Sequence, residues 1–350
     1  MDLEKILPKD GPPINEVSKY IEKYKNDLIV IKYGGNVFID RNIFNNFIAD
    51  IFILNKLGIS IAIIHGGGPR IKRELDKSNI ESKFIKGLRV TDDKIINIVE
   101  SVLIDFNNDI VNSLKKYEVK AISLHTKENN IIEVVPEAKE LGYVGIPKKI
   151  ENSILEKILE KKQVPIISPL GLGENNQTYN INGDTAAGAI AKSLKSRRLL
   201  LMTNVEGVLD KNKKLIEEIS SSEILKMIQN NTITEGMIPK INTCLDAVNK
   251  GVTAVATRPC AYCNYFDLHY VASHEAGYGE GAVHFIEAGH CTPGGADQVY
   301  HIGGCSSNIV PAEDDLCRIW ATVDYRYCQR LFYRNHLRNG TAGTAIFAYG

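Results

Sequence analysis

The sequence has no excess of charge of either sign and no long apolar run. Lysine plus arginine and aspartate plus glutamate number 42 each, so the charge balance does not predict nucleic acid or an anionic membrane as a partner. No apolar stretch approaches the roughly 18 residues that a membrane-spanning helix needs. The first residues also lack the basic start and apolar core of a secretory signal. We therefore expect a cytoplasmic protein that binds neither nucleic acid nor membranes.

Cysteine is nearly absent from the first part of the chain, and lysine is absent from the last part. Cys244 is the only cysteine in residues 1–255, whereas residues 256–350 contain the other six, most of the histidines and no lysine. One core rarely shows such a change in residue usage. We predict a domain at residues 1–255 and an atypical Cys/His-rich segment at residues 256–350.

The cysteines of the second segment do not form a complete metal motif. Cys260 and Cys263 have zinc-knuckle spacing, but no second Cys-x-x-Cys or histidine pair follows at a suitable distance. We expect no metal site there, and thiols rather than disulfides, because nothing else in the sequence indicates secretion.

Residues 1–255 alternate short apolar strands with longer amphipathic helical patterns. This alternation predicts an α/β fold with a mostly parallel sheet and helices on both faces. Gly58 is placed to end the helix that precedes it. We expect the strands at 119–124 and 131–135 to form a hairpin. The remaining strands are predicted at 28–33, 59–65, 164–168, 199–203 and from 252, and the helices at 14–24, 44–57, 92–116, 152–161, 184–194, 222–229 and 238–250.

Glycine turns follow the first two predicted strands, at Gly34-Gly35 and at Gly66-Gly67-Gly68. Ligands of open α/β sheets bind beyond the carboxyl ends of the strands. The N–H groups of such a turn, next to a helix N-terminus, can form an anion site, although one turn alone could serve only close packing. Neither turn has the spacing of a P-loop or of a dinucleotide fingerprint. Two turns in succession favour an anion site.

Charged residues accompany these turns. Lys32 lies inside an apolar strand, where a lysine is costly unless it meets an anion or reaches solvent at an edge. Asp184 begins a helix and could be only its N-cap. Lys240 also begins a helix, where the dipole disfavours a cation. Arg89 has a planar fork suited to a carboxylate, although an isolated arginine is usually solvated. Jointly these residues indicate an anion-binding site.

Two asparagines, Asn180 and Asn182, precede Asp184 and have two readings. They could be turn formers alone, or they could contribute amide groups to the same site.

Seven motifs resemble the acetylglutamate kinases, which belong to the amino acid kinase (carbamate-kinase-like) superfamily. They occur in that family's order and spacing between residues 28 and 255. The motifs are Lys32-Tyr-Gly-Gly-Asn, His65-Gly-Gly-Gly-Pro, Gly87-Leu-Arg-Val-Thr-Asp92, Leu141-Gly-Tyr-Val-Gly145, Asn180-Ile-Asn-Gly-Asp184, Thr203-Asn-Val-Glu-Gly-Val208 and Gly236-Met-Ile-Pro-Lys240.

The resemblance implies a three-layer α/β/α sandwich around a mostly parallel open sheet, with an amino-acid side and, from about residue 160 to 255, a nucleotide side. It implies ATP-dependent phosphorylation of the side-chain carboxylate of N-acetyl-L-glutamate in arginine biosynthesis, with Mg²⁺ arriving on ATP. The implied substrate-binding residues are Gly66, Gly67, Arg89, Asn180 and Asn182. The implied ATP and phosphate contacts are Gly34, Gly35, Asn204 and Gly207.

In this resemblance Lys32 and Lys240 neutralise the phosphoryl group, and Asp184 orients both lysines. The nucleophile is an ionised carboxylate, so the reaction needs alignment and charge relief rather than a general base. Asn204 stands where the family usually has aspartate, so this contact keeps a hydrogen bond without the charge.

Regulation and assembly are expected from the helix at 14–24, which is similar to the N-terminal extension of hexameric, arginine-inhibited members. A dimer or hexamer formed through this helix is therefore predicted. The family's closing strands are not evident after residue 255, which leaves two origins for the tail. It is foreign or chimeric, or residues 281–289 and 343–347 are divergent versions of those strands.

Two other functions stay open on the sequence. One is a related kinase acting on another carboxylate, such as carrier-linked aminoadipate. The other is a regulatory subunit that binds nucleotide without turnover, which the asparagine at Asn204 and the altered tail motivate.

Overall fold

The computed structural model describes residues 27–34, 41–203, 218–233, 237–252, 254–259 and 282–285, together with residues 18, 21, 22, 24, 25 and 212. Almost all of them belong to one compact unit, Lys19–Ala288. Most of the helix predicted at 14–24 and most of residues 256–350 lie outside the described residues. Within the described part of the chain, no helix is both long and apolar enough to cross a membrane.

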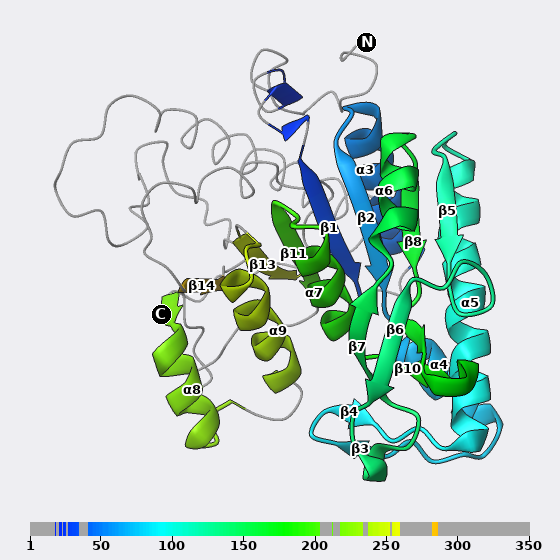
Figure 1. Cartoon of the computed structure of the whole chain (residues 1–350), viewed down its shortest axis with the longest axis vertical. Coiled ribbons are helices and arrows are strands. Elements are labelled where there is room, and N and C mark those ends of the chain that lie inside the picture. Colours follow the sequence, from blue (N-terminus) through cyan, green and yellow to red (C-terminus); the bar gives the residue numbers. More distant parts are fainter. Residues whose placement is uncertain are drawn as a thin grey trace, which may run out of the picture. The chain divides into compact units, whose positions relative to one another are not determined.

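An eight-stranded sheet forms the centre of this unit (Figure 1). Its strand order is β12-β14-β13-β11-β1-β2-β8-β5, and all neighbours are parallel except β12 and β14. The strands are β1 (Leu28–Tyr33), β2 (Ser60–His65), β5 (Ala121–Leu124), β8 (Val164–Ile167), β11 (Arg198–Thr203), β12 (Glu218–Ser220), β13 (Ala254–Pro259) and β14 (Ala282–Phe285). The predicted α/β class with a mostly parallel sheet is confirmed.

Helices connect the strands, as parallel pairing requires. They are α3 (Arg41–Lys56), α4 (Gly68–Lys77), α5 (Asp93–Lys115), α6 (Asn152–Glu160), α7 (Gly183–Ser193), α8 (Ser221–Gln229) and α9 (Ile238–Asn249). Gly58 adopts φ 83° directly after α3, a conformation that costs glycine little, and it ends that helix as predicted.

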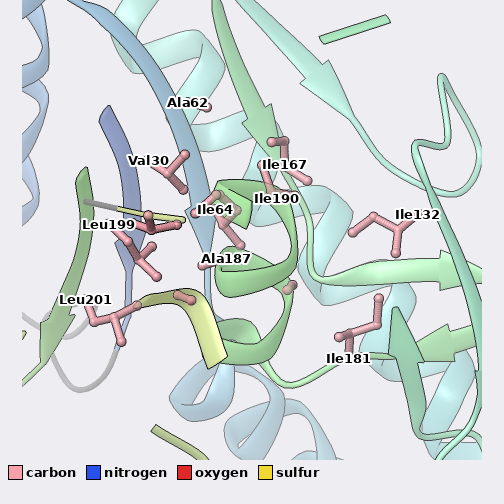
Figure 2. Packing of buried hydrophobic residues seen from close by; sticks show 14 of the residues in the cluster. Val30, Ala62, Ile64, Ile132, Ile167, Ile181, Ala187, Ile190, Leu199 and Leu201 are labelled. Atoms are coloured by element: carbon pink, nitrogen blue, oxygen red, sulfur yellow. The ribbon is translucent and has the colours of Figure 1, made fainter. Parts of the chain in front are cut away.

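One face of the sheet packs against α7. Val30, Ala62 and Ile64 lie on this face and contact a core that includes Ala187 and Ile190 of α7 (Figure 2). Alternate residues of a strand point to opposite faces, so Lys32, two residues after Val30, also lies on the α7 face.

The opposite face packs against α3 and α5. The ring of Tyr33 stacks on Phe47 of α3 with centroids 3.9 Å apart, and the ring of His65 meets Phe106 of α5 edge-on at 5.0 Å. Tyr33 and His65 are register partners in β1 and β2. A polar side chain at the carboxyl end of β1 or β2 therefore faces either α7 or the helices α3 and α5, depending on its position in the strand.

A smaller four-stranded sheet and a short hairpin were not predicted. The sheet has the order β10-β9-β6-β7 and consists of β6 (Ile132–Pro136), β7 (Gly145–Ile150), β9 (Leu170–Leu172) and β10 (Thr178–Asn180). The hairpin pairs β3 (Phe84–Ile85) with β4 (Leu88–Arg89). Both lie at the end of the main sheet toward which the arrows of β1 and β2 point (Figure 1).

The hairpin predicted from residues 119–124 and 131–135 is wrong. β5 instead pairs parallel with β8 in the main sheet, and β6 pairs with β7 in the smaller sheet. The burial along β6 alternates at first, as in antiparallel sheets with one solvated face. β5, which pairs with the fully buried β8, therefore lies in the main sheet, and β6, which has exposed positions, lies in the smaller sheet.

The boundary predicted at residue 255 falls within a strand. β13 runs from Ala254 to Pro259, and β14, formed by residues 282–285, lies between β12 and β13. The main sheet therefore continues past the composition change.

Candidate active site

Three charged side chains from distant parts of the sequence meet at the carboxyl end of β1. The Nζ atoms of Lys32 and Lys240 each lie 2.9 Å from Asp184, on Oδ1 and Oδ2 respectively. All three side chains are about nine-tenths buried. The two lysines leave one positive charge unbalanced in a region with little solvent. Such a region attracts an anion.

Local structure explains how these side chains meet. Lys32 reaches the α7 face because of its parity in β1, and Asp184 lies in the first turn of α7. Gly34 makes room for the lysine, because a Cβ at this position would collide with the Lys32 ammonium group. Lys240 comes from the first turn of α9, which packs against α7.

The N-cap role considered for Asp184 belongs to Asn182. The Oδ1 atom of Asn182 accepts hydrogen bonds from the N–H groups of Asp184 at 2.9 Å and Thr185 at 3.1 Å. This capping leaves the Asp184 carboxylate free for the lysines. No described residue accepts from the amide nitrogen of Asn182, which lines the cavity and can donate to a ligand.

Burial and charge act against each other on these groups. Burial disfavours ionised Asp184, but the adjacent Lys32 and Lys240 outweigh burial and hold its pKa well below the usual range. Burial lowers the pKa of Lys32, and Asp184 offsets part of that effect. An incoming anion would favour the charged form of Lys32 further.

A cavity of about 210 Å³ lies beside this cluster and includes Lys32 and Asp184 in its wall. All five predicted substrate-binding residues line it, and they come from different elements. The remaining wall is lined by Gly66, Gly67, Gly68, Pro69, Ile71, Phe84, Gly87, Leu88, Arg89, Leu103, Val144, Pro169, Asn180, Ile181, Asn182 and Gly183.

The glycine turn after β2 presents backbone donors at one side of the cavity. The N–H of Gly66 already donates to the Tyr33 carbonyl at 2.7 Å. Gly67 is the N-cap of α4 and supplies no side chain, and no described protein group accepts from the N–H groups of Gly67 or Gly68. A Cβ on Gly67 would lie 2.5 Å from Leu103 Cδ2, so any larger residue there would displace the buried Leu103 side chain. These two N–H groups at a helix N-terminus can bind an anion.

Arg89 and Asn180 are joined through Thr91. The Thr91 hydroxyl donates to the Arg89 carbonyl at 2.9 Å and accepts from Asn180 Nδ2 at 3.3 Å. The Arg89 guanidinium lies 4.7 Å from the Phe84 ring centroid and donates to Ser82. Thr91 is completely buried, so it ties the hairpin of β3 and β4 to the smaller sheet. Sequence reasoning did not assign Thr91 a role.

Three predicted phosphate contacts lie outside the described residues, namely Gly35, Asn204 and Gly207. The remaining predicted residues, from Lys32 to Lys240, lie at the cavity or at the charged cluster beside it. Among the residues that the structure describes, no three histidine, cysteine, aspartate or glutamate side chains are grouped so that they could hold a metal ion.

A buried polar network behind the glycine turn was missed in the sequence. It contains His65, Asn107, Ser123 and Ser168. The signal was present, because Asn107 interrupts the apolar face of α5 and is completely buried there. A polar residue in such a position requires hydrogen-bond partners.

Comparisons with known proteins give a consistent result. The profile of the Amino acid kinase family matches residues 27–256. The chain is 53% identical over 254 residues to the acetylglutamate kinase of Pelagibacter ubique (strain HTCC1062), covering 73% of this chain and 88% of that protein. It is 42% identical over 250 residues to the acetylglutamate kinase of Methylobacterium nodulans, covering 67% of this chain and 82% of that protein. Among solved structures, smu.665 from Streptococcus mutans UA159 superposes with a TM-score of 0.61 at 33% identity, covering 66% of this chain and 94% of that one.

Proposed function

This chain belongs to the amino acid kinase family, and on that premise we propose that it is an acetylglutamate kinase. It transfers the terminal phosphoryl group of ATP to the side-chain carboxylate of N-acetyl-L-glutamate, which gives N-acetyl-L-glutamyl 5-phosphate and ADP. One observation supports this most strongly: two buried ammonium groups share a single carboxylate beside a cavity lined by Gly67 and Gly68, whose N–H groups have no acceptor among the described residues.

The lysines have a direct role in this reaction. The acceptor carboxylate and ATP are both anions, so their approach is opposed by charge repulsion. Lys32 and Lys240 supply one net positive charge after Asp184 is counted, in a site where water does not screen it. Asp184 holds both ammonium groups in place before the substrates bind. No general base is required, because the acceptor is already ionised.

The wall of the cavity carries groups that can bind the carboxylates of the amino-acid substrate. We assign its carboxylates to the Arg89 guanidinium and to the glycine turn at Gly66 and Gly67. Of these two glycines, Gly67 has the free N–H group. Asn180 and Asn182 contribute amide groups on the opposite wall. These assignments rest on the lining of the cavity and on the motif positions.

ATP is assigned to the side of the charged cluster on which Lys240 lies, with Gly34, Gly35, Asn204 and Gly207 as phosphate and nucleotide contacts. Both oxygens of Asp184 are occupied by lysines. The described part of the site therefore fits a magnesium ion held by ATP phosphate oxygens rather than by a protein ligand set. Bound there, Mg²⁺ would neutralise phosphate charge.

ADP release measured with and without N-acetyl-L-glutamate tests the proposal, with hydroxylamine trapping of the acyl phosphate as a second readout. We expect ADP release only with the amino acid and in proportion to trapped product. A panel containing glutamate, aspartate and a carrier-linked aminoadipate separates the related kinase. Calorimetry that detects ATP binding without any trapped product would instead support the regulatory subunit.

Two further features are proposed. Residues 1–255 are the kinase domain, with the nucleotide side at about 160–255, and residues 256–350 are an atypical segment. The family match at 27–256 and the change in composition support this division, with β13 and β14 extending the main sheet into the second segment. The protein is a homo-oligomer, a dimer or a hexamer that forms through the helix predicted at 14–24. Sedimentation of the full chain and of a chain lacking residues 1–26 tests this assembly.

A further inference from the structure

A closed hydrogen-bond network lies directly behind the glycine turn, on the face of the sheet away from Lys32. His65 ends β2, and its ring is completely buried. Its Nδ1 atom lies 2.9 Å from the Gly66 carbonyl oxygen, and its Nε2 atom lies 3.2 Å from Ser168 Oγ and 3.2 Å from Asn107 Nδ2. The imidazole therefore connects the turn to the interior of the protein.

The neighbours of the ring determine where its proton lies. Asn107 Nδ2 donates to the Ile166 carbonyl at 2.9 Å, and Asn107 Oδ1 accepts from Ser123 at 2.7 Å, so the orientation of this amide is fixed. The Gly66 carbonyl oxygen can only accept, so Nδ1 must carry the proton and donate to it. Nε2 of the neutral ring is then an acceptor, and it faces the Ser168 hydroxyl and the Asn107 NH₂ group.

Burial favours this neutral form. It lowers the pKa of His65 to about 4, so the ring stays neutral throughout the physiological range. One arrangement of protons then pairs both ring nitrogens: Nδ1–H donates to the Gly66 carbonyl, and the Ser168 hydroxyl donates to Nε2. The two Nδ2 hydrogens of Asn107 go to the Ile166 carbonyl and to Ser168 Oγ.

The position of the Gly66 carbonyl controls the next N–H group. A peptide group is planar and trans, so the C=O of Gly66 and the N–H of Gly67 point in opposite directions. His65 draws the carbonyl toward the buried side. The Gly67 N–H is consequently directed away from the ring, and Gly67 lines the cavity. A rotated peptide would remove this donor from the cavity.

We propose that His65 is a positioning residue for substrate: its Nδ1–H fixes the Gly66–Gly67 peptide so that the Gly67 N–H points at an anionic group of the bound amino acid. Asn107 and Ser168 position the ring in turn. This inference rests on the proposed function and adds to it a residue that does not touch substrate.

Two substitutions separate positioning from simple structural support. Asparagine places its amide nitrogen close to the position of Nδ1, so His65→Asn can keep the bond to the Gly66 carbonyl. Glutamine places its amide near the position of Nε2, so His65→Gln keeps contact with Asn107 and Ser168 but leaves the carbonyl free. Both variants lose one side of the network and should lose similar stability.

We expect His65→Gln to raise the KM for N-acetyl-L-glutamate about tenfold, the factor for about 1.4 kcal/mol. His65→Asn should stay within about twofold of the wild type, and the KM for ATP should be unchanged in both. Equal KM values in the two variants, or a larger rise in His65→Asn, would overturn the proposal. Absence of acetylglutamate-dependent ADP release in the wild type would instead refute the proposed function.

A measurement on the wild type covers the case in which either variant fails to fold. Nitrogen NMR of protein labelled in its histidine rings reports the tautomer of His65 through the two-bond correlations of the ring. The His65 signal is identified as the one that is missing from the spectrum of any folded His65 variant. A neutral ring with its proton on Nδ1 at pH 6 supports the inference. A proton on Nε2, or a charged ring at that pH, overturns it.

Discussion

Two buried polar clusters occupy opposite faces of the same pair of strands. On the α7 face, Lys32 and Lys240 share the Asp184 carboxylate. On the α5 face, His65 connects Asn107 and Ser168 to the glycine turn through neutral hydrogen bonds. Both clusters lie at the carboxyl ends of β1 and β2, where ligands of open α/β sheets bind.

The clusters differ in what they leave unsatisfied. The charged cluster has one positive charge in excess, whereas the neutral network pairs its donors with acceptors. Buried charge without a full complement of opposite charge is costly, and a protein retains it where a ligand supplies the balance. A closed network has no such deficit and serves to hold backbone in place. We therefore assign the charged cluster to contact with the substrates and the neutral network to support of the backbone beside the site.

The largest effect is expected from removal of the carboxylate between the lysines. Asp184→Asn leaves two buried ammonium groups without a counter-charge and should lower the free energy of unfolding by about 3–5 kcal/mol. Asp246→Asn is a matched control, because Asp246 also pairs with two lysines, Lys192 and Lys250, each at 2.7 Å. Its side chain is 46% exposed, so the cost should be below about 1 kcal/mol. Urea unfolding measures both, and equal losses would contradict the distinction.

The next effect concerns the chemical step. Lys240→Ala and Lys32→Ala should each lower kcat by about 10²–10³, the range for loss of one preorganised donor at a developing charge. Lys192→Ala serves as the control, because Lys192 lies on the same helix as Asp184 but pairs with Asp246. Steady-state ADP release at saturating substrates measures kcat. Wild-type turnover in either cluster variant would remove that lysine from the mechanism.

A smaller, pH-dependent effect should mark the neutral network. The folded pKa of His65 is about 4, below its ordinary value of 6.5, so the unfolded chain takes up this proton first as the pH falls. The wild type should lose about 3 kcal/mol of stability from this group between pH 6.5 and pH 4, and nothing above pH 6.5.

The comparison for that measurement is His65→Gln, which cannot titrate in this range. Urea unfolding at pH 7, 5.5 and 4.5 should show a steeper decline for the wild type than for the variant. Parallel declines would mean that His65 has the same pKa in the folded and the unfolded protein. The ring would then be charged in the folded protein at these pH values, and the network would not be neutral.

Much of the fold followed from apolar periodicity, and its exceptions have physical causes. The strands at Leu28–Tyr33 and Val164–Ile167 are buried apolar runs, which predict central parallel strands. β6 carries charged and exposed residues, so its pattern did not reveal that it would leave the main sheet for a smaller one. Short strands such as β9 and β10 have three residues each and too little periodicity to be predicted.

For the candidate site too, one part could be predicted from the sequence and another part could not. Lys32 and Lys240 were proposed from their local misfit, a lysine in an apolar strand and a cation at a helix start, whereas Asp184 had a good local explanation as an N-cap. The family resemblance implied that Asp184 orients both lysines, but only the folded chain shows the two contacts of 2.9 Å. The N-cap was assigned to Asp184 as an alternative, and only the folded backbone showed that Asn182 takes that role.

The parallel α/β core, the glycine turns and the lysines in unfavourable local positions could be predicted from residue order, because burial, strand parity and backbone freedom depend on near neighbours. The residues that share a charge, and the peptide that His65 holds, become known only from the folded chain. Electrostatic and hydrogen-bond partners are set by distances of about 3 Å, and chain connectivity does not specify such distances between β1, α7 and α9.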